Sequence, residues 1–451
     1  MFVSRGGGKQ RGSSPATSIF NLVNNVAGAG LLTLSAGMAG GVGSGPAAII
    51  GVALGAMSAY TFAAVGTCCE ALNVKDFRGL WCKTIGESSA FAIDAAISVM
   101  CLSACVIYSG IIADVVTSLV ATAGLGNPGR AVNLGLVTTG VLLPLCLLKS
   151  LAALGFTSLL GLGAIIYTAL FIFVRALDGT YASPNGVFYN ALLSEGPRAS
   201  GLLPSFEMAS RWGVSSKAFV LASNLGLAYI AHYNAPRYYS ELDRKTPEKF
   251  RGVVWTGFGV LATLYVGVML AGHSIFGDNC QSSILNNFAG NDPLAVGGRI
   301  ATLVSIIFGY PLAFVGLLDS LKGACASVSG GKGPLGALSN PHPPAWLDNG
   351  LRVALLALAT VTALVVEDIG LVVGLTGSLV GACIVYIAPS IISLNARAYA
   401  LKKGGVGREA KVHKMLGGGV DQWICRALVP LGIAIGGIGA KETITAYFGP
   451  F

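Results

Sequence analysis

The stretch ATSIFNLVNNVAGAGLLTLSAGMAG, residues 16–40, decides the fold. It is apolar and long enough to cross a bilayer, which takes about 20 residues of helix, but Asn24, Asn25 and the small triplet 28–30 interrupt it. A helix in lipid must satisfy its own backbone polar groups, so such an interruption is tolerated only inside the protein or beside a cavity. The stretch therefore predicts a broken membrane helix, and its break is where we expect a ligand to bind.

The composition places the whole chain in a membrane. Of its 451 residues, 53% are hydrophobic and 11% are charged, and the mean hydropathy is +0.71. Soluble domains carry about 25% charged residues. The sequence therefore predicts an all-α polytopic membrane protein. The tail 1–15 lacks the short apolar core and cleavage site of a signal peptide, so we expect the first span to direct insertion itself.

Apolar segments of about 20 residues predict eleven spans. They cover residues 16–40, 45–71, 90–122, 131–148, 152–174, 215–232, 253–271, 300–321, 351–366, 371–394 and 427–448. An odd number of spans places the two termini on opposite sides of the membrane.

The basic residues predict which side is which. With a cytoplasmic N-terminus, 22 of the 29 Lys and Arg residues lie on cytoplasmic segments and 7 on the other face. This is a strong positive-inside bias. The net charge of +9 is then explained by charges at the lipid surface, so we expect no nucleic-acid partner. No Cys or His spacing resembles a zinc site, and we expect neither a metal nor a cofactor.

A second interruption lies in FVLASNLGLAYIAHYN, residues 219–234, which carries Asn224, Gly226, His232 and Asn234 in an otherwise apolar segment. Interrupted helices at corresponding positions of two halves are typical of secondary transporters with inverted repeats, and they point to a site at the bilayer midplane. We therefore expect a first repeat over 16–174, a second over 215–394, and an additional helix over 427–448.

Two motifs resemble one known family. FNLVNNVAGAGLLTL from Phe20 is similar to the opening motif of the amino acid/auxin permease family, which includes sodium-coupled neutral amino acid transporters and vacuolar amino acid transporters. AHYNAPRYYSELDRKT from Ala231 is similar to the family's His-containing motif. The resemblance covers most of the chain. It implies a LeuT-type 5+5 inverted repeat with an eleventh helix, and transport of amino acids, neutral ones favoured, by alternating access.

The resemblance also implies that substrate lies between the first and sixth helices, with the third and eighth completing the pocket. A broken helix suits an amino acid. N–H groups at the start of the second half-helix favour the carboxylate, and carbonyls at the end of the first half accept from the ammonium. Gly28 and Gly30 let the backbone approach the ligand; the alternative is close helix packing. The expected substrate-binding residues are Asn25, Val26, Ala27, Gly28, Ala29, Gly30, Tyr108 and Asn224.

The coupling ion is harder to predict. In sodium-coupled members of the family, an Asn matching Asn24 and a hydroxyl residue of the eighth helix help to hold the cation. The positions two and four before Pro311 are Gly309 and Ile307, which have no hydroxyl, although Ser305 lies nearby. This favours H+ over Na+, with uniport and exchange as alternatives. The expected coupling or gating residues are Asn24, Ser305, Gly309, Asp114 and His232.

Several alternatives remain open at this level. His232 has a structural alternative as a helix-packing residue, and Asp114 as a helix-end charge. We expect Glu70, Asp94 and Asp319 to be solvated near the cytoplasmic interface. An enzyme would need His232 and Asn234 as its polar pair, and we expect none. A transporter-like amino-acid receptor is a second alternative. We expect a monomer in the plasma membrane or in a vacuolar or endolysosomal membrane.

Overall fold

The computed structural model describes residues 12–126, 128–148, 157–194, 203–205, 212–329, 336–337, 343–402 and 418–449. Over these residues the secondary structure is helical, apart from one isolated parallel bridge between Ser13 and Leu242. The predicted all-α class is confirmed. Most of the tail 1–15, and residues 152–156 of the fifth expected span, lie outside the described residues.

The first half of the chain begins with the broken span, which is followed by four others. Its elements are α1 (Pro15–Val26), η1 (Ala29–Thr33), α2 (Leu34–Met38), α3 (Ser44–Leu72), α4 (Phe77–Thr84), η2 (Glu87–Ser89), α5 (Ala90–Thr122), α6 (Arg130–Val137), η3 (Thr138–Leu142), α7 (Leu143–Leu147), α8 (Thr157–Leu177) and α9 (Val187–Ser194). The chain turns between α2 and α3 at Gly40 and Gly41, whose φ angles of 86° and 106° suit glycine.

The second half repeats the order of a broken span followed by long helices. Its elements are α10 (Ala218–Ala228), η6 (His232–Asn234), α11 (Ala235–Glu241), α12 (Pro247–Phe276), η7 (Gly277–Asn279), η8 (Ile284–Asn286), α13 (Pro293–Ser329), α15 (Ala345–Val365), α16 (Ile369–Leu375), η9 (Thr376–Gly381), η10 (Cys383–Ile387), α17 (Ala388–Lys402) and α19 (Gly419–Phe448).

The two interrupted segments differ from all the other spans. Among the described residues, nine helices are long and apolar enough to cross a membrane, and the pair α1 and η1–α2, bent by 49°, makes a tenth span. The one expected span that remains is the sixth along the sequence, residues 215–232. It contains α10, of 11 residues, which the turn η6 joins to α11, of 7 residues, and neither helix alone is long enough to cross a membrane.

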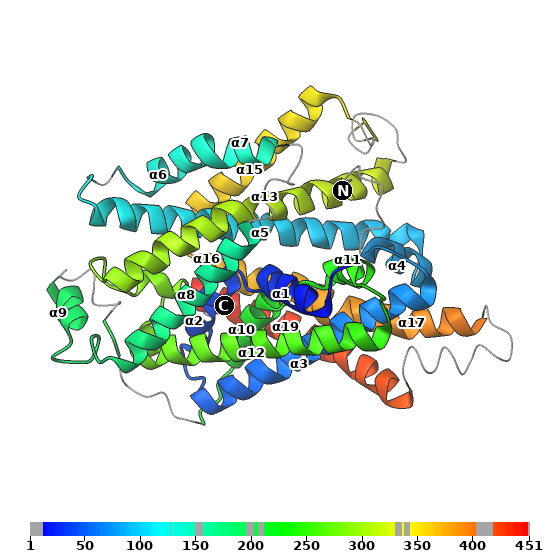
Figure 1. Cartoon of the computed structure of the whole chain (residues 1–451), viewed down its shortest axis with the longest axis horizontal. Helices are drawn as coiled ribbons and strands as arrows, with labels where there is room; N and C mark the ends of the chain where they lie inside the picture. The colour runs from blue at the N-terminus through cyan, green and yellow to red at the C-terminus, as the bar shows by residue number, and fades with distance from the viewer. Residues whose placement is uncertain are drawn as a thin grey trace.

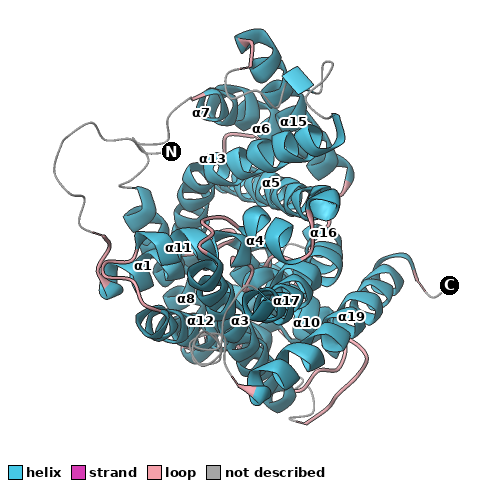
Figure 2. Ribbon diagram, turned by 90° about the vertical axis from the view of Figure 1, so that its right-hand side faces the viewer, coloured by secondary structure: helices cyan, strands magenta, loops and turns pink. Residues whose placement is uncertain are grey.

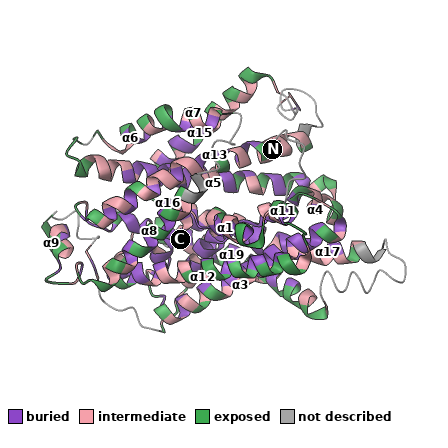
Figure 3. Cartoon of the chain, in the orientation of Figure 1, coloured by how far each residue is buried: buried purple, intermediate pink, exposed green. Residues whose placement is uncertain are grey.

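The broken helices lie between two pairs of long helices. In Figure 1, α1 and α10 lie between the pair α5 and α13 on one side and the pair α3 and α12 on the other, and both pairs pack closely. Figure 2 shows the bundle turned by 90°, with α15 and α19 toward its edges. Of an 18-residue apolar stretch in each helix, only 22% is buried in α15 and 28% in α19, against 61% in the span Ile369–Tyr399, which begins with α16. Figure 3 shows buried residues concentrated around the central helices.

Candidate functional site

The break in the first span is a short stretch of non-helical backbone. α1 ends at Val26, and Ala27 (φ −71°, ψ 86°) and Gly28 (φ −123°, ψ −155°) leave the helical region before η1 begins. Val26, Ala27 and Ala29 are buried, Gly28 and Gly30 are half-buried, and Asn25 is exposed. The break therefore falls at the start of the predicted triplet.

The break in the second span falls at two of its polar residues, His232 and Asn234. α10 continues through Asn224 and Gly226 to Ala228, and the helix resumes at Ala235 after the turn His232–Asn234. Asn224 lies within α10, and its side chain bonds to the first broken span: its Nδ2 donates to the Thr33 carbonyl at 3.4 Å. The Oδ1 of Asn224 is buried and has no partner among the described residues.

The two breaks touch each other. A Cβ atom placed on Gly30 would lie 3.0 Å from the Cα and 3.1 Å from the Cβ of Ala228. Such distances require the neighbouring atoms to shift. Gly30 is thus needed for close approach of the two broken helices, as the alternative of close helix packing holds. The same contact brings the non-helical backbone of the first break next to that of the second.

Tyr108 covers the first break from α5. A Cβ atom on Gly28 would lie 3.6 Å from the Tyr108 hydroxyl oxygen, and the Tyr108 ring lies 6.2 Å from the ring of Tyr310 on α13. The third and eighth spans therefore flank the first break, as the family resemblance implied. The binding roles of Tyr108, Asn224 and residues 25–30 stay predictions.

Asn24 and Ser305 converge on one point of α8. A Cβ atom on Gly161 would lie 3.3 Å from the Asn24 Oδ1 and 3.4 Å from the Ser305 Oγ. Two of the expected coupling residues, from the first and eighth spans, are thus neighbours. Gly309 is not part of this group, because a Cβ atom there would meet nothing within 4 Å.

His232 lies in the second break but faces α3. It is fully buried, and its Nε2 is 2.9 Å from the Thr61 Oγ1 and 3.0 Å from the Ser58 carbonyl oxygen. Its Nδ1 has no partner among the described residues. The ring therefore fixes the break to α3.

The two carboxylates Asp114 and Asp94 are both ion-paired. Asp114 accepts from the Arg130 Nε at 2.8 Å and from the Asn286 Nδ2 at 3.2 Å, which links α5 to α6 and η8. The expectation that Asp94 is solvated is wrong. Its side chain is 6% exposed and pairs with Arg78 of α4 at 2.8 Å, because α4 folds over the end of α5.

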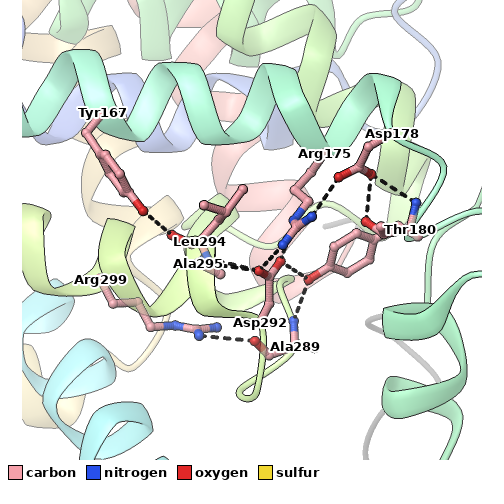
Figure 4. A network of polar contacts seen from close by, with 10 residues as sticks. Tyr167, Arg175, Asp178, Thr180, Ala289, Asp292, Leu294, Ala295 and Arg299 are labelled. Carbon is pink, nitrogen blue, oxygen red and sulfur yellow. Dashed lines mark hydrogen bonds and ion pairs between the residues drawn. The ribbon is translucent and has the colours of Figure 1, made fainter.

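Figure 4 shows a polar network around Asp292, at one end of the bundle, that the sequence did not reveal. The buried Asp292 carboxylate receives the Arg175 Nε at 2.9 Å and the Arg175 Nη2 at 2.5 Å. The Tyr181 hydroxyl donates to the same carboxylate at 2.9 Å. Arg175 also pairs with Asp178 at 2.6 Å. The network fixes the end of α8 to the start of α13.

Arg299 holds the segment that precedes Asp292. Its guanidinium donates to the carbonyls of Leu285, Ala289 and Phe288. The same segment reaches α5 through Asn286, and η8 packs against η1. The segment 284–292 therefore lies over the second half of the first span. The charged residues at the ends of apolar segments were the only signal of this arrangement in the sequence.

Two broken helices in contact, with a scaffold of long helices on both sides, are the arrangement of the LeuT-type inverted-repeat fold. A solved structure titled "Inward facing conformation of Mhp1" shares this fold, with a TM-score of 0.59 over 97% of this chain and 92% of that chain, at 10% identity. Among the described residues, no group of three His, Cys, Asp or Glu side chains could hold a metal ion.

Residues 11–414 match the family described as transmembrane amino acid transporter protein, and the chain belongs to this family. It is 25% identical to "Amino acid transporter AVT6A" of Arabidopsis thaliana over 332 residues, 69% of this chain and 68% of that protein. It is 23% identical to "Amino acid transporter AVT6E" of the same plant over 416 residues, 86% of this chain and 77% of that protein. The family confirms a transporter and excludes the enzyme alternative.

Proposed function

We propose that this protein is a secondary active transporter that moves neutral amino acids by alternating access. The observation that carries the proposal is the contact between the two breaks, where Gly30 lies against Ala228. Half-helix ends at such a point offer N–H groups to a carboxylate and carbonyls to an ammonium. Amino acid transport by the family and by the named relatives supports this substrate class.

Uncharged substrates are favoured by the lack of charged side chains at the breaks. Residues 24–31 and 224–234 contain no Asp, Glu, Lys or Arg. The histidine among them, His232, is directed toward Thr61 and Ser58 of α3. A charged substrate side chain would therefore find no counter-ion from either break, and its desolvation would oppose binding.

We propose coupling to H+ through His232. Imidazole is the side chain whose ordinary pKa allows it to change charge near neutral pH, and ionisable groups inside a membrane protein mark proton pathways by default. His232 lies in the second break, so a proton on it would affect the backbone that meets the substrate.

Na+ is the second candidate, and a specific contact favours it. The Asn24 Oδ1 and the Ser305 Oγ approach the same point beside Gly161, and oxygen atoms are the ligands that such hard cations take.

We propose further that the N-terminus is cytoplasmic, that the protein acts as a monomer, and that it resides in the plasma membrane or a vacuolar or endolysosomal membrane.

The test is uptake of labelled amino acids into proteoliposomes under an imposed pH gradient or an imposed Na+ gradient. Accumulation driven by the pH gradient, and lost in His232→Gln while Ser305→Ala keeps it, supports proton coupling. Accumulation driven by Na+ and lost in Ser305→Ala would replace it with sodium coupling. Binding of an amino acid without uptake under either gradient would favour the receptor alternative.

A further inference from the structure

Tyr265 contacts both breaks although it belongs to neither broken helix. It lies on α12 and is fully buried. Its hydroxyl oxygen is 2.8 Å from the Val26 carbonyl oxygen and 2.9 Å from the Ala228 carbonyl oxygen. Val26 is the last residue of α1, and Ala228 is the last residue of α10. One side chain therefore joins the ends of both first half-helices.

These two carbonyls need a donor. The last carbonyls of a helix have no N–H partner within the helix, and they carry the negative end of the helix dipole. A buried carbonyl left unpaired is unfavourable. The Tyr265 hydroxyl has one proton, so at any moment it donates fully to one of the two. Each carbonyl has two lone pairs, so both retain capacity to accept a hydrogen bond from a ligand ammonium.

Tyr265 belongs to one of two long helices, α3 and α12, that pack on each other. Its ring lies 5.0 Å from the ring of Tyr229, and the Tyr229 hydroxyl donates to the Gly51 carbonyl of α3 at 3.1 Å. α3 and α12 pack along their lengths. Tyr265 is therefore mounted on α12, which packs against α3, and its ring also meets Tyr229 of the second break.

We propose that Tyr265 is a positioning residue of the amino-acid site. Its hydroxyl holds the end of α1 and the end of α10 at one point, so that the Val26 and Ala228 carbonyls are presented together to a single ammonium group. This inference rests on the proposed function for its ligand. The shared anchor itself rests only on the contacts of the hydroxyl.

The test compares Tyr265→Phe with Tyr239→Phe. Both substitutions remove one hydroxyl from a buried tyrosine, but the Tyr239 hydroxyl donates to Glu70, at the end of α3. In proteoliposomes, Tyr265→Phe should raise the KM for amino acid uptake by about tenfold, the upper range for one hydrogen bond, with kcat changed less than twofold. Tyr239→Phe should leave the KM unchanged. An unchanged KM in Tyr265→Phe would overturn the proposal.

A second measurement needs no substrate. Amide hydrogen exchange of the full chain in detergent should become faster in Tyr265→Phe at both breaks, residues 24–31 and 226–234, and stay unchanged there in Tyr239→Phe. Faster exchange at one break alone, or equally throughout the chain, would refute a shared anchor. If the wild type transports no amino acid but exchange changes at both breaks, the proposed function fails and the anchor stands.

Discussion

Gly30 is the residue at which the packing and ligand-binding interpretations of the first break meet. A side chain at this position would enter the space of Ala228. We expect Gly30→Leu to abolish amino acid uptake, because the two broken helices could no longer approach. Overpacking of this kind costs about 1–3 kcal/mol of stability, so the protein should still reach the membrane.

Gly259→Leu is the matched control for this substitution. Gly259 lies on the exposed face of α12, and a Cβ atom there would meet nothing within 4 Å. Uptake per molecule of surface-labelled protein should be normal in Gly259→Leu and at background in Gly30→Leu. Substantial uptake by Gly30→Leu would show that the site does not lie at this contact.

The residues of the first break could be predicted from the sequence because each departs from an apolar surrounding. Asn24, Asn25 and the triplet 28–30 are conspicuous in a span that is otherwise apolar. Tyr265 could not be predicted, because a tyrosine in a membrane helix is common and its role depends on carbonyls 239 and 37 positions away. Side-chain partners of this kind are set by the tertiary fold alone.

At the scale of elements, the spans could be predicted, but the short helices and side-chain contacts at their ends could not. Hydrophobic length identified the long helices, whereas α4 and α9, of 8 residues each, are too short to be detected in this way. The sixth span was predicted to break near its polar residues. It breaks after Ala228, at the polar residues His232 and Asn234, whereas Asn224 stays in α10 and its amide contacts Thr33.

The fastening of α8 to α13 yields a stability prediction. We expect Asp292→Asn to lower the free energy of unfolding by about 3–5 kcal/mol, the range for removing one partner of a buried ion pair. The Asp292 side chain is 0% exposed and that of Arg175 is 10% exposed. Thermal unfolding in detergent would measure the change. Glu241→Gln, which removes the exposed pair with Arg237, should change stability by less than about 1 kcal/mol. Equal effects of the two substitutions would contradict the assignment.

Asp178, at the end of α8, gives the same junction a pH dependence. Burial alone would raise the pKa of Asp178, but hydrogen bonds from Thr180 and the Arg175 guanidinium together hold it below its ordinary value. A lowered pKa in the folded state stabilises the protein above the unfolded value of about 3.9, and this contribution is lost as the pH falls through the folded value.

We therefore expect Asp178→Asn to lower the melting temperature at pH 7, and we expect the difference from the wild type to shrink as the pH falls below about 4. Melting curves of both proteins between pH 7 and pH 3 would test this. A difference that stays constant over the whole range would mean that the Asp178 charge does not stabilise the junction.

At the scale of the whole molecule, the number of crossings depends on the second broken segment. Leu125 follows α5, and Trp346 lies at the start of α15. Between them the chain passes through α6–α7, α8, the pair α10 and α11, α12 and α13. If the pair α10 and α11 crosses the membrane, five crossings separate the two residues and they lie on opposite sides. If it does not, four crossings place them on the same side.

Labelling with a membrane-impermeant maleimide distinguishes the two arrangements. Leu125 and Trp346 are 77% and 75% exposed, whereas all ten native cysteines are buried or half-buried, so the unsubstituted protein supplies the background. We expect Leu125→Cys to react in right-side-out vesicles and Trp346→Cys in inside-out vesicles, because the positive-inside bias makes the N-terminus cytoplasmic. The reverse pattern would invert the orientation and leave the fold intact. Reaction of both from one side would mean that α10 and α11 form a re-entrant segment, and the inverted repeat would then lose its sixth crossing.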